Sequence, residues 1–251
     1  MNDTMYIEQI KDISTRKMLS DMSKSSILDL KNKNLKVDKE IQSRMAVNAT
    51  DKCEFDQITD KYNRRQITSS EYTSFNQNYS LRRDSLDLNI LSFKMQKSAN
   101  ECRQASYNYL DWFCKFGYGE DTLEIYNSQL GKNVLMPKEG LYNSYFKYIM
   151  EQERIRLDQK YHFLCLQLNF CKKPGSNSYE QYVDPKRIER DMEDVRIQLE
   201  TLKSYESQVG DQPVDFVDFS LLTVEDLMNG DSQQIFDKFF LKRSDEKKRA
   251  M

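Results

Sequence analysis

The chain has 251 residues, of which 38% are hydrophobic and 31% charged, and its formal net charge is −2 at pH 7. Its 15 Tyr and 13 Phe exclude wholesale disorder, because disordered chains are poor in aromatic residues. The near balance of basic and acidic residues lacks the basic excess that is usual in proteins dedicated to wrapping nucleic acid.

The cysteines and the N-terminal sequence predict an intracellular, cytoplasmic location. The five cysteines are an odd number and are scattered through helix-like sequence, which does not suit a disulfide framework. The first residues carry acids where a signal peptide needs positive charge and then an apolar run. No stretch approaches the ~18 apolar residues that a membrane helix needs, so we expect a soluble protein with no membrane span.

Residues 1–116 contain neither Gly nor Pro, the two residues that most often mark turns. This absence favours a region of long helices over a sheet. Within it, Asp51 follows a polar stretch and predicts a helix start. Thr68 and Glu71 match a capping box, which predicts a second helix from Ser69 to Phe116, where glycines end it.

Residues 117–139 are interpreted as a connector, with a short helix over 122–130 and then a loop. A second run without Gly or Pro, residues 141–173, predicts another helix. Asp184 and Pro185 then suit the cap and first turn of a helix that ends before Gly210. Residues 140–209 are therefore predicted to form a helical pair.

The helix predicted before Gly210 has heptad spacing, which is typical of a helix that lies along another helix. We interpret its apolar residues as candidate partner-binding residues: Ile188, Met192, Val195, Leu199 and Leu202. An antiparallel partner within the same chain explains the pattern equally well, because the heptads are few.

Residues 210–251 form an acidic and aromatic segment with a basic tail. Short helices are predicted over 224–228, capped by Thr223, and over 232–241. The segment has the composition of sequences that order on binding, and its candidate anchors for a partner are Phe216, Phe219, Leu222, Leu227 and Phe236. The competing interpretation is that the same residues cap the protein's own bundle.

Signatures of catalysis are missing from the sequence. Seven scattered glycines form no phosphate-binding loop, and the only histidine is His162. This residue lies near Cys165 and Cys171, but the surrounding apolar residues predict that all three pack in a core. We therefore predict no catalytic residues, no cofactor and no bound metal.

The chain is predicted to be all-α, an elongated helical bundle or coiled-coil-like protein with few or no strands. The function expected from this is non-catalytic: a scaffold, adaptor, chaperone or subunit of a homo-oligomer or larger complex that acts through protein partners. The alternative is a nucleic-acid-associated factor. It would use two arginine pairs, residues 64–65 and 82–83, with neighbouring aromatic rings and the basic tail.

Overall fold

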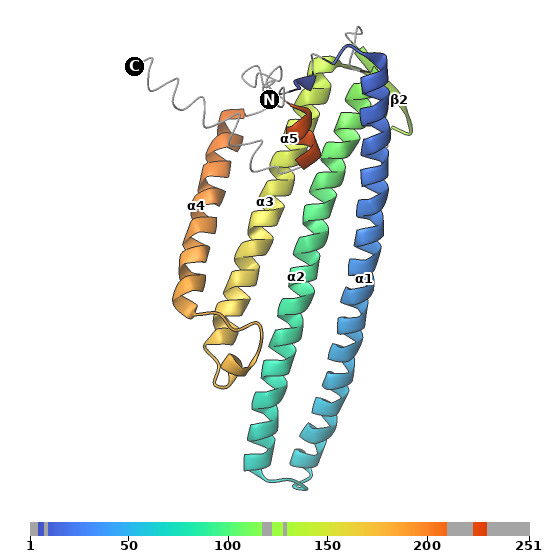
Figure 1. The fold of residues 1–251 in the computed structure, drawn as a ribbon. Helices are drawn as coiled ribbons and strands as arrows, with labels where there is room; N and C mark the ends of the chain where they lie inside the picture. The colour runs from blue at the N-terminus through green and yellow to red at the C-terminus, as the bar shows by residue number, and fades with distance from the viewer. Residues whose placement is uncertain (1–4, 8–9, 117–121, 128–129, 210–222, 230–251) are drawn as a thin grey trace, which may run out of the picture. The chain divides into compact units, whose positions relative to one another are not determined.

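The computed structural model describes residues 5–7, 10–116, 122–127, 130–209 and 223–229 (Figure 1). In chain order the elements are α1 (Ile13–Asn63), α2 (Ser69–Phe116), β1 (Thr122–Asn127), β2 (Lys132–Pro137), α3 (Lys138–Cys171), the short 3-10 helix η2 (Ser176–Ser178), α4 (Pro185–Val209) and α5 (Val224–Asn229). The predicted all-α class is confirmed, with one small β-hairpin in the described part.

The chain divides into two compact units that are not contiguous in sequence. Unit 1 consists of Met1–Lys33, Ser98–Ile155 and Thr201–Met251, and unit 2 of Asn34–Lys97 and Arg156–Glu200. Each of the four long helices therefore contributes residues to both units. The segment boundaries drawn from the sequence follow helix ends instead, and they stay a prediction.

Side-chain caps start the helices where the sequence predicts them. The Thr68 hydroxyl accepts the Glu71 N–H at 3.2 Å, and the Glu71 carboxylate accepts the Thr68 N–H at 2.8 Å. These bonds satisfy two backbone donors that the first turn of α2 would leave unpaired. Asp184 caps α4 by accepting the Lys186 N–H at 3.1 Å. The predicted starts of both helices are confirmed.

The predicted helix start at Asp51 is wrong, because α1 continues through it. Thr50, in the polar stretch before Asp51, donates its hydroxyl to the Ala46 carbonyl at 3.1 Å and stays helical. Asp51 lies opposite α2 instead of capping a helix, with its carboxylate 4.0 Å from Arg82 Nε.

The turn that follows α1 contains Arg65, a non-glycine residue with a positive φ of 57°. The N–H of Gln66 donates to the Lys61 carbonyl at 2.8 Å, and that of Arg65 donates to the Tyr62 carbonyl at 2.9 Å. This pair of bonds is the Schellman arrangement, whose left-handed residue is usually glycine. Because no glycine is present here, this end of the helix could not be recognised from the sequence.

The short helix predicted over 122–130 is also wrong. Residues Thr122–Asn127 form strand β1, which pairs antiparallel with β2 from Thr122 opposite Pro137 to Asn127 opposite Lys132. The β-branched and aromatic residues of these strands favour extended backbone. Gly131 lies in the connecting turn with a φ of 61°, a conformation that glycine adopts without strain.

Candidate functional site

The predicted seam of α4 is largely covered by the chain itself. Ile188 and Val195 are buried in unit 2 and Leu202 is buried in unit 1, whereas Met192 and Leu199 are half-buried. In unit 2, Lys172 at the end of α3 forms a 3.8 Å ion pair with Glu189 of α4. This contact supports the antiparallel intrachain partner, and a partner chain on α4 stays a prediction.

The candidate anchors of the C-terminal segment fall mostly outside the described residues. This applies to Phe216, Phe219, Leu222 and Phe236, and to the helix predicted over 232–241. Leu227 is described, and it is 0% exposed in α5. The short helix predicted over 224–228 is confirmed, with Thr223 and Asp226 forming its capping box.

The cluster around the only histidine does not have the predicted packing. His162 is exposed, Cys165 is half-buried and Cys171 is buried. The prediction that all three pack in a core was wrong for His162, because it lies on an exposed side of α3 together with its neighbour Tyr161. Within the described residues, no group of three or more His, Cys, Asp or Glu side chains could hold a metal ion.

The most extensive side-chain arrangement of unit 2 is an antiparallel helical hairpin, made by residues 34–63 of α1 and 69–97 of α2. Near its turn the two helices meet through aromatic rings. Tyr62 stacks on Tyr72 with ring centroids 4.4 Å apart, and Phe55 stacks on Tyr79 at 4.3 Å. Such ring pairs contribute beyond the area that they bury, so they hold this end together.

Further from the turn the same seam is polar. Asn48 donates to the Asp87 carboxylate at 3.2 Å, and Lys97 forms a bidentate contact with Asp38 at 2.8 and 3.0 Å. Arg82 reaches Glu54 at 3.3 Å. Polar residues at seam positions cost stability but fix register, because a shifted pairing would leave them without partners.

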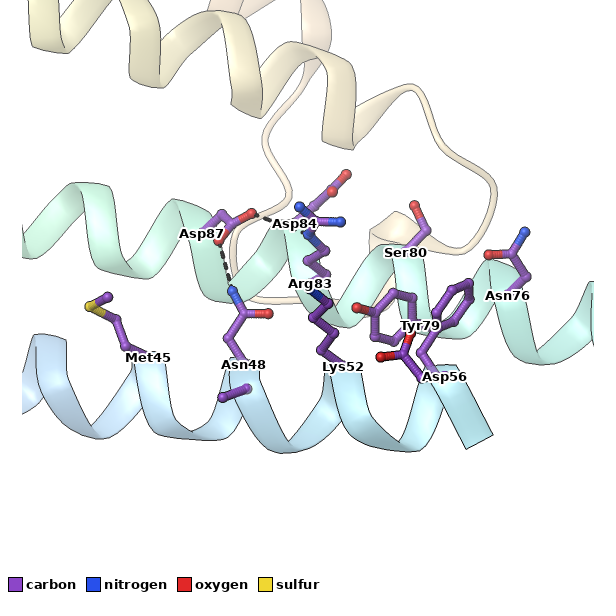
Figure 2. Close-up of a pocket in the computed structure, with 12 residues that line it drawn as sticks. Met45, Asn48, Lys52, Asp56, Asn76, Tyr79, Ser80, Arg83, Asp84 and Asp87 are labelled. Carbon is purple, nitrogen blue, oxygen red and sulfur yellow. Dashed lines mark hydrogen bonds and ion pairs between the residues drawn. The ribbon is translucent and has the colours of Figure 1, made fainter. Parts of the chain in front are cut away.

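A groove of about 660 Å³ opens along one flank of this hairpin (Figure 2). Its wall on α1 includes Met45, Ala49 and Lys52, and its wall on α2 includes Ser80 and Arg83. The lining of each wall includes a small side chain, Ala49 on α1 and Ser80 on α2. We call this feature the hairpin groove.

The loop that joins α3 to α4 is attached to the α2 wall of the hairpin groove. Lys173 donates to the Ser80 hydroxyl at 2.6 Å and pairs with the Asp84 carboxylate at 2.5 Å. Further along the loop, the Gln181 side chain accepts a bond from Ser85 at 2.9 Å and donates to Asn89 at 3.2 Å. These contacts fix the loop within unit 2 and neutralise Asp84.

Some of the charged side chains that line the groove form ion pairs within the chain. Asp84 is paired with Lys173, and Asp87 lies 3.9 Å from Arg83. Lys52 and Asp56 are both exposed and form no ion pair within the described residues. A partner surface would therefore meet one free cation and one free anion on α1, beside the apolar side chain of Met45.

One of the two arginine pairs considered for nucleic acid contacts acids of the same unit. Arg82 contacts Glu54 and Asp51, and Arg83 contacts Asp87, while Arg64 and Arg65 are exposed at the turn. The aromatic rings near them stack on one another across the seam. The rings are thus engaged within the hairpin, which weakens the case for base stacking.

Sequence reasoning missed the hairpin seam and its groove. The signal was present as a 4-3 spacing that runs through polar residues as well as apolar ones, namely Val37, Ile41, Arg44, Asn48, Asp51, Phe55, Ile58 and Tyr62. A search for apolar heptads alone passes over it, because three of these positions are polar or charged.

Comparison with known proteins adds no family: no family model matches the chain, and no curated protein or solved structure is significantly similar to it. Among the helices of the described residues, none combines the length and the apolar character needed to cross a membrane.

Proposed function

We propose that the protein is a non-catalytic assembly component that binds a partner protein through the groove flank of its helical hairpin. One observation carries the proposal. Charged and polar residues occupy part of the seam between α1 and α2, while Met45, on the rim of the groove, is 57% exposed. A hairpin that served only its own stability would place the apolar side chain inside and the charges outside.

A second apolar side chain extends this flank. Leu35 is 60% exposed and precedes Ala49 of the groove by fourteen residues, which is two heptads and the same side of the helix. Exposed Leu and Met beside a polar groove are typical of the core and rim of a protein interface. The free charges of Lys52 and Asp56 would fix the orientation of the bound partner more than they would raise its affinity, as charges at the rim of an interface do.

The proposal is tested by Met45→Glu, measured as the size of the native complex by size-exclusion chromatography with light scattering in extracts of the producing cells. The matched control is Val47→Glu. Val47 is also an exposed apolar residue of α1, but it lies two residues on and so points to another side of the helix. We expect Met45→Glu to release the protein from its complex and Val47→Glu to leave the complex intact.

Three outcomes would contradict the proposal. One is a wild-type protein that elutes as a free monomer in the extract, and another is equal loss of the complex in both variants. The third is salt-sensitive binding to nucleic acid that Met45→Glu leaves unchanged and Arg83→Glu abolishes, which would favour the nucleic-acid alternative.

A further inference from the structure

The part of α1 that belongs to unit 2 carries opposite charges at the two ends of one side. The α1–α2 seam repeats in heptads, so residues that are a multiple of seven apart lie on one side of α1. Lys39 and Asp60 are three heptads apart, and both are exposed. Asp56, on the wall of the hairpin groove, lies one turn before Asp60 (Figure 2). This side of α1 therefore borders the groove flank, with a cation toward residue 34 and two anions toward residue 63.

The charges at both ends of this side have no partner of opposite sign in their own unit. Asp38, the acid next to Lys39 in the sequence, is already bound to Lys97 of α2. Lys39 and Asp60 form no ion pair within the described residues. The helix between them spans about 32 Å, at ~1.5 Å per residue. A partner that satisfies both must present an anion and a cation at this separation and in the reverse order along the helix.

A second copy of the chain, placed antiparallel, has this charge pattern. The midpoint between Lys39 and Asp60 lies beside Ala49 of the groove flank. A twofold axis that passes there places Lys39 of each chain opposite Asp60 of the other, with Asp56 one turn away. Such an interface is isologous, so each ion pair is made twice. A polyanion such as nucleic acid does not match this side, because the anions toward residue 63 would repel it.

The same axis also covers the apolar part of the groove flank. Leu35 precedes Ala49 by fourteen residues, and α1 ends fourteen residues after it, at Asn63. The overlap of two antiparallel α1 helices thus includes both Leu35 and Met45, which are 60% and 57% exposed in the single chain. Apolar contacts in the overlap would supply affinity, and the charges at its ends would select the antiparallel orientation.

We propose that the partner bound by the groove flank is a second copy of this chain, held in an antiparallel dimer through α1. This inference rests on the proposed function, because it names the partner of the same surface. The charge complementarity between Lys39 and Asp60 is the observation that selects this occupant.

The test is charge reversal in the purified full-length chain, with the dissociation constant of the dimer measured by sedimentation equilibrium. In a dimer of the Lys39→Glu chain two acids face each other, and in a dimer of the Asp60→Lys chain two cations do. We expect each variant to raise the dissociation constant at least about tenfold. An equimolar mixture of the two variants has opposite charges on both sides of the axis, so we expect it to dimerise within about threefold of the wild type.

The matched control is Lys61→Glu, which makes the same change of charge on another side of α1. Lys61 is exposed and lies two heptads after Val47, outside the groove flank. We expect its dissociation constant to equal that of the wild type, whereas Met45→Glu should weaken the dimer. Circular dichroism confirms that each variant is folded, as expected for exposed positions.

Three results would overturn the second copy as the partner. The first is a wild-type chain that keeps its monomer mass of 29.9 kDa at every concentration. The second is a dimer that neither charge reversal weakens, or that Lys61→Glu weakens as much. The third is a mixture of the two reversed chains that dissociates as readily as each chain alone.

Failure of the proposed function gives a different result. If the purified chain is a monomer but Met45→Glu still releases the protein from a complex in cell extracts, the flank binds a different protein and only the second copy is excluded. If Met45→Glu leaves the complex in extracts intact, the groove flank is not the binding surface, and the proposed function fails with it.

Discussion

The guanidinium of Arg44 lies 5.2 Å from the centroid of the Phe93 ring, at a position of the α1–α2 seam where an apolar residue would be usual. Arg44 also lies 3.7 Å from Glu40 on its own helix, and its Nε is buried without a hydrogen-bond acceptor within the described residues. A cation over a ring face is attractive, but its desolvation opposes the gain. The seam is thus built for specific pairing more than for maximal stability.

This arrangement predicts that Arg44→Leu stabilises the protein. Leucine fills a seam position without the desolvation cost of a partly buried charge, and the remaining carboxylate of Glu40 is 56% exposed and stays solvated, so we expect a gain of about 1 kcal/mol. Urea unfolding followed by circular dichroism measures the change. Lys39→Leu, at an exposed position of the same helix, is the control and should stay within about 0.5 kcal/mol of the wild type. A lower urea midpoint for Arg44→Leu would contradict the interpretation.

The left-handed turn at the end of α1 predicts that Arg65→Gly is also stabilising. A non-glycine residue in this conformation destabilises the folded state by about 1–2 kcal/mol. Glycine removes this cost, but it also gives the unfolded chain more conformational freedom, which offsets part of the gain. We expect a net gain of about 0.5–1 kcal/mol by thermal unfolding. The neighbouring Arg64 keeps a helical bond, donating its N–H to the Asp60 carbonyl at 3.0 Å, so Arg64→Gly should be destabilising. Equal effects at both positions would refute the assigned geometry.

The caps of the helices could be predicted from the sequence because their chemistry is local. Thr68 and Glu71 are three residues apart, and their mutual bonds need nothing from the rest of the chain. Arg65 could not be predicted in the same way, because its left-handed conformation is usual for glycine and no glycine is present at this turn. The strand at 122–127 was missed because its partner, β2, is what stabilises the extended form.

In the candidate site, too, local features could be predicted from the sequence and features that depend on distant residues could not. The heptad spacing of α4 could be seen in the sequence. The surface that covers Ile188 and Val195 depends on where α3 lies, and no local sequence pattern predicts that position. The hairpin groove depends on which side chains of α1 and α2 line the same flank, among them Ala49 and Ser80. That follows from the antiparallel register, and the register is set by polar pairs such as Asn48 and Asp87.

The capping box of α2 predicts a pH dependence. Backbone and side-chain bonds from Thr68 hold the pKa of Glu71 below its ordinary value of 4.5. A carboxyl whose pKa is lowered by folding stabilises the folded state above its unfolded pKa, and this contribution is lost as the pH falls through the folded pKa. The stability difference between the wild type and Glu71→Ala should therefore be constant near pH 7 and shrink below pH 4.5. A difference that grows on acidification would contradict this sign.

The cysteines should differ sharply in reactivity. Burial and the neighbouring Asp111 carboxylate raise the pKa of Cys114 to about 11, so only about one thiol in a thousand is ionised at pH 8. Cys53 is exposed on α1. With iodoacetamide at pH 8, mass spectrometry should find Cys53 modified first and Cys114 modified only after unfolding. Cys53→Ser removes the fast phase, and rapid labelling of Cys114 in the folded chain would refute its burial.

The central claim, that the groove flank of the hairpin binds a protein partner, is tested most directly by site-specific photo-crosslinking in the producing cells. A photoreactive residue is placed at Met45, at Leu35 or, as a control, at the exposed Val47 on another side of α1. We expect a discrete protein adduct of one size from positions 45 and 35, and none from position 47. Adducts of equal yield from all three positions, or from none of them, would contradict it.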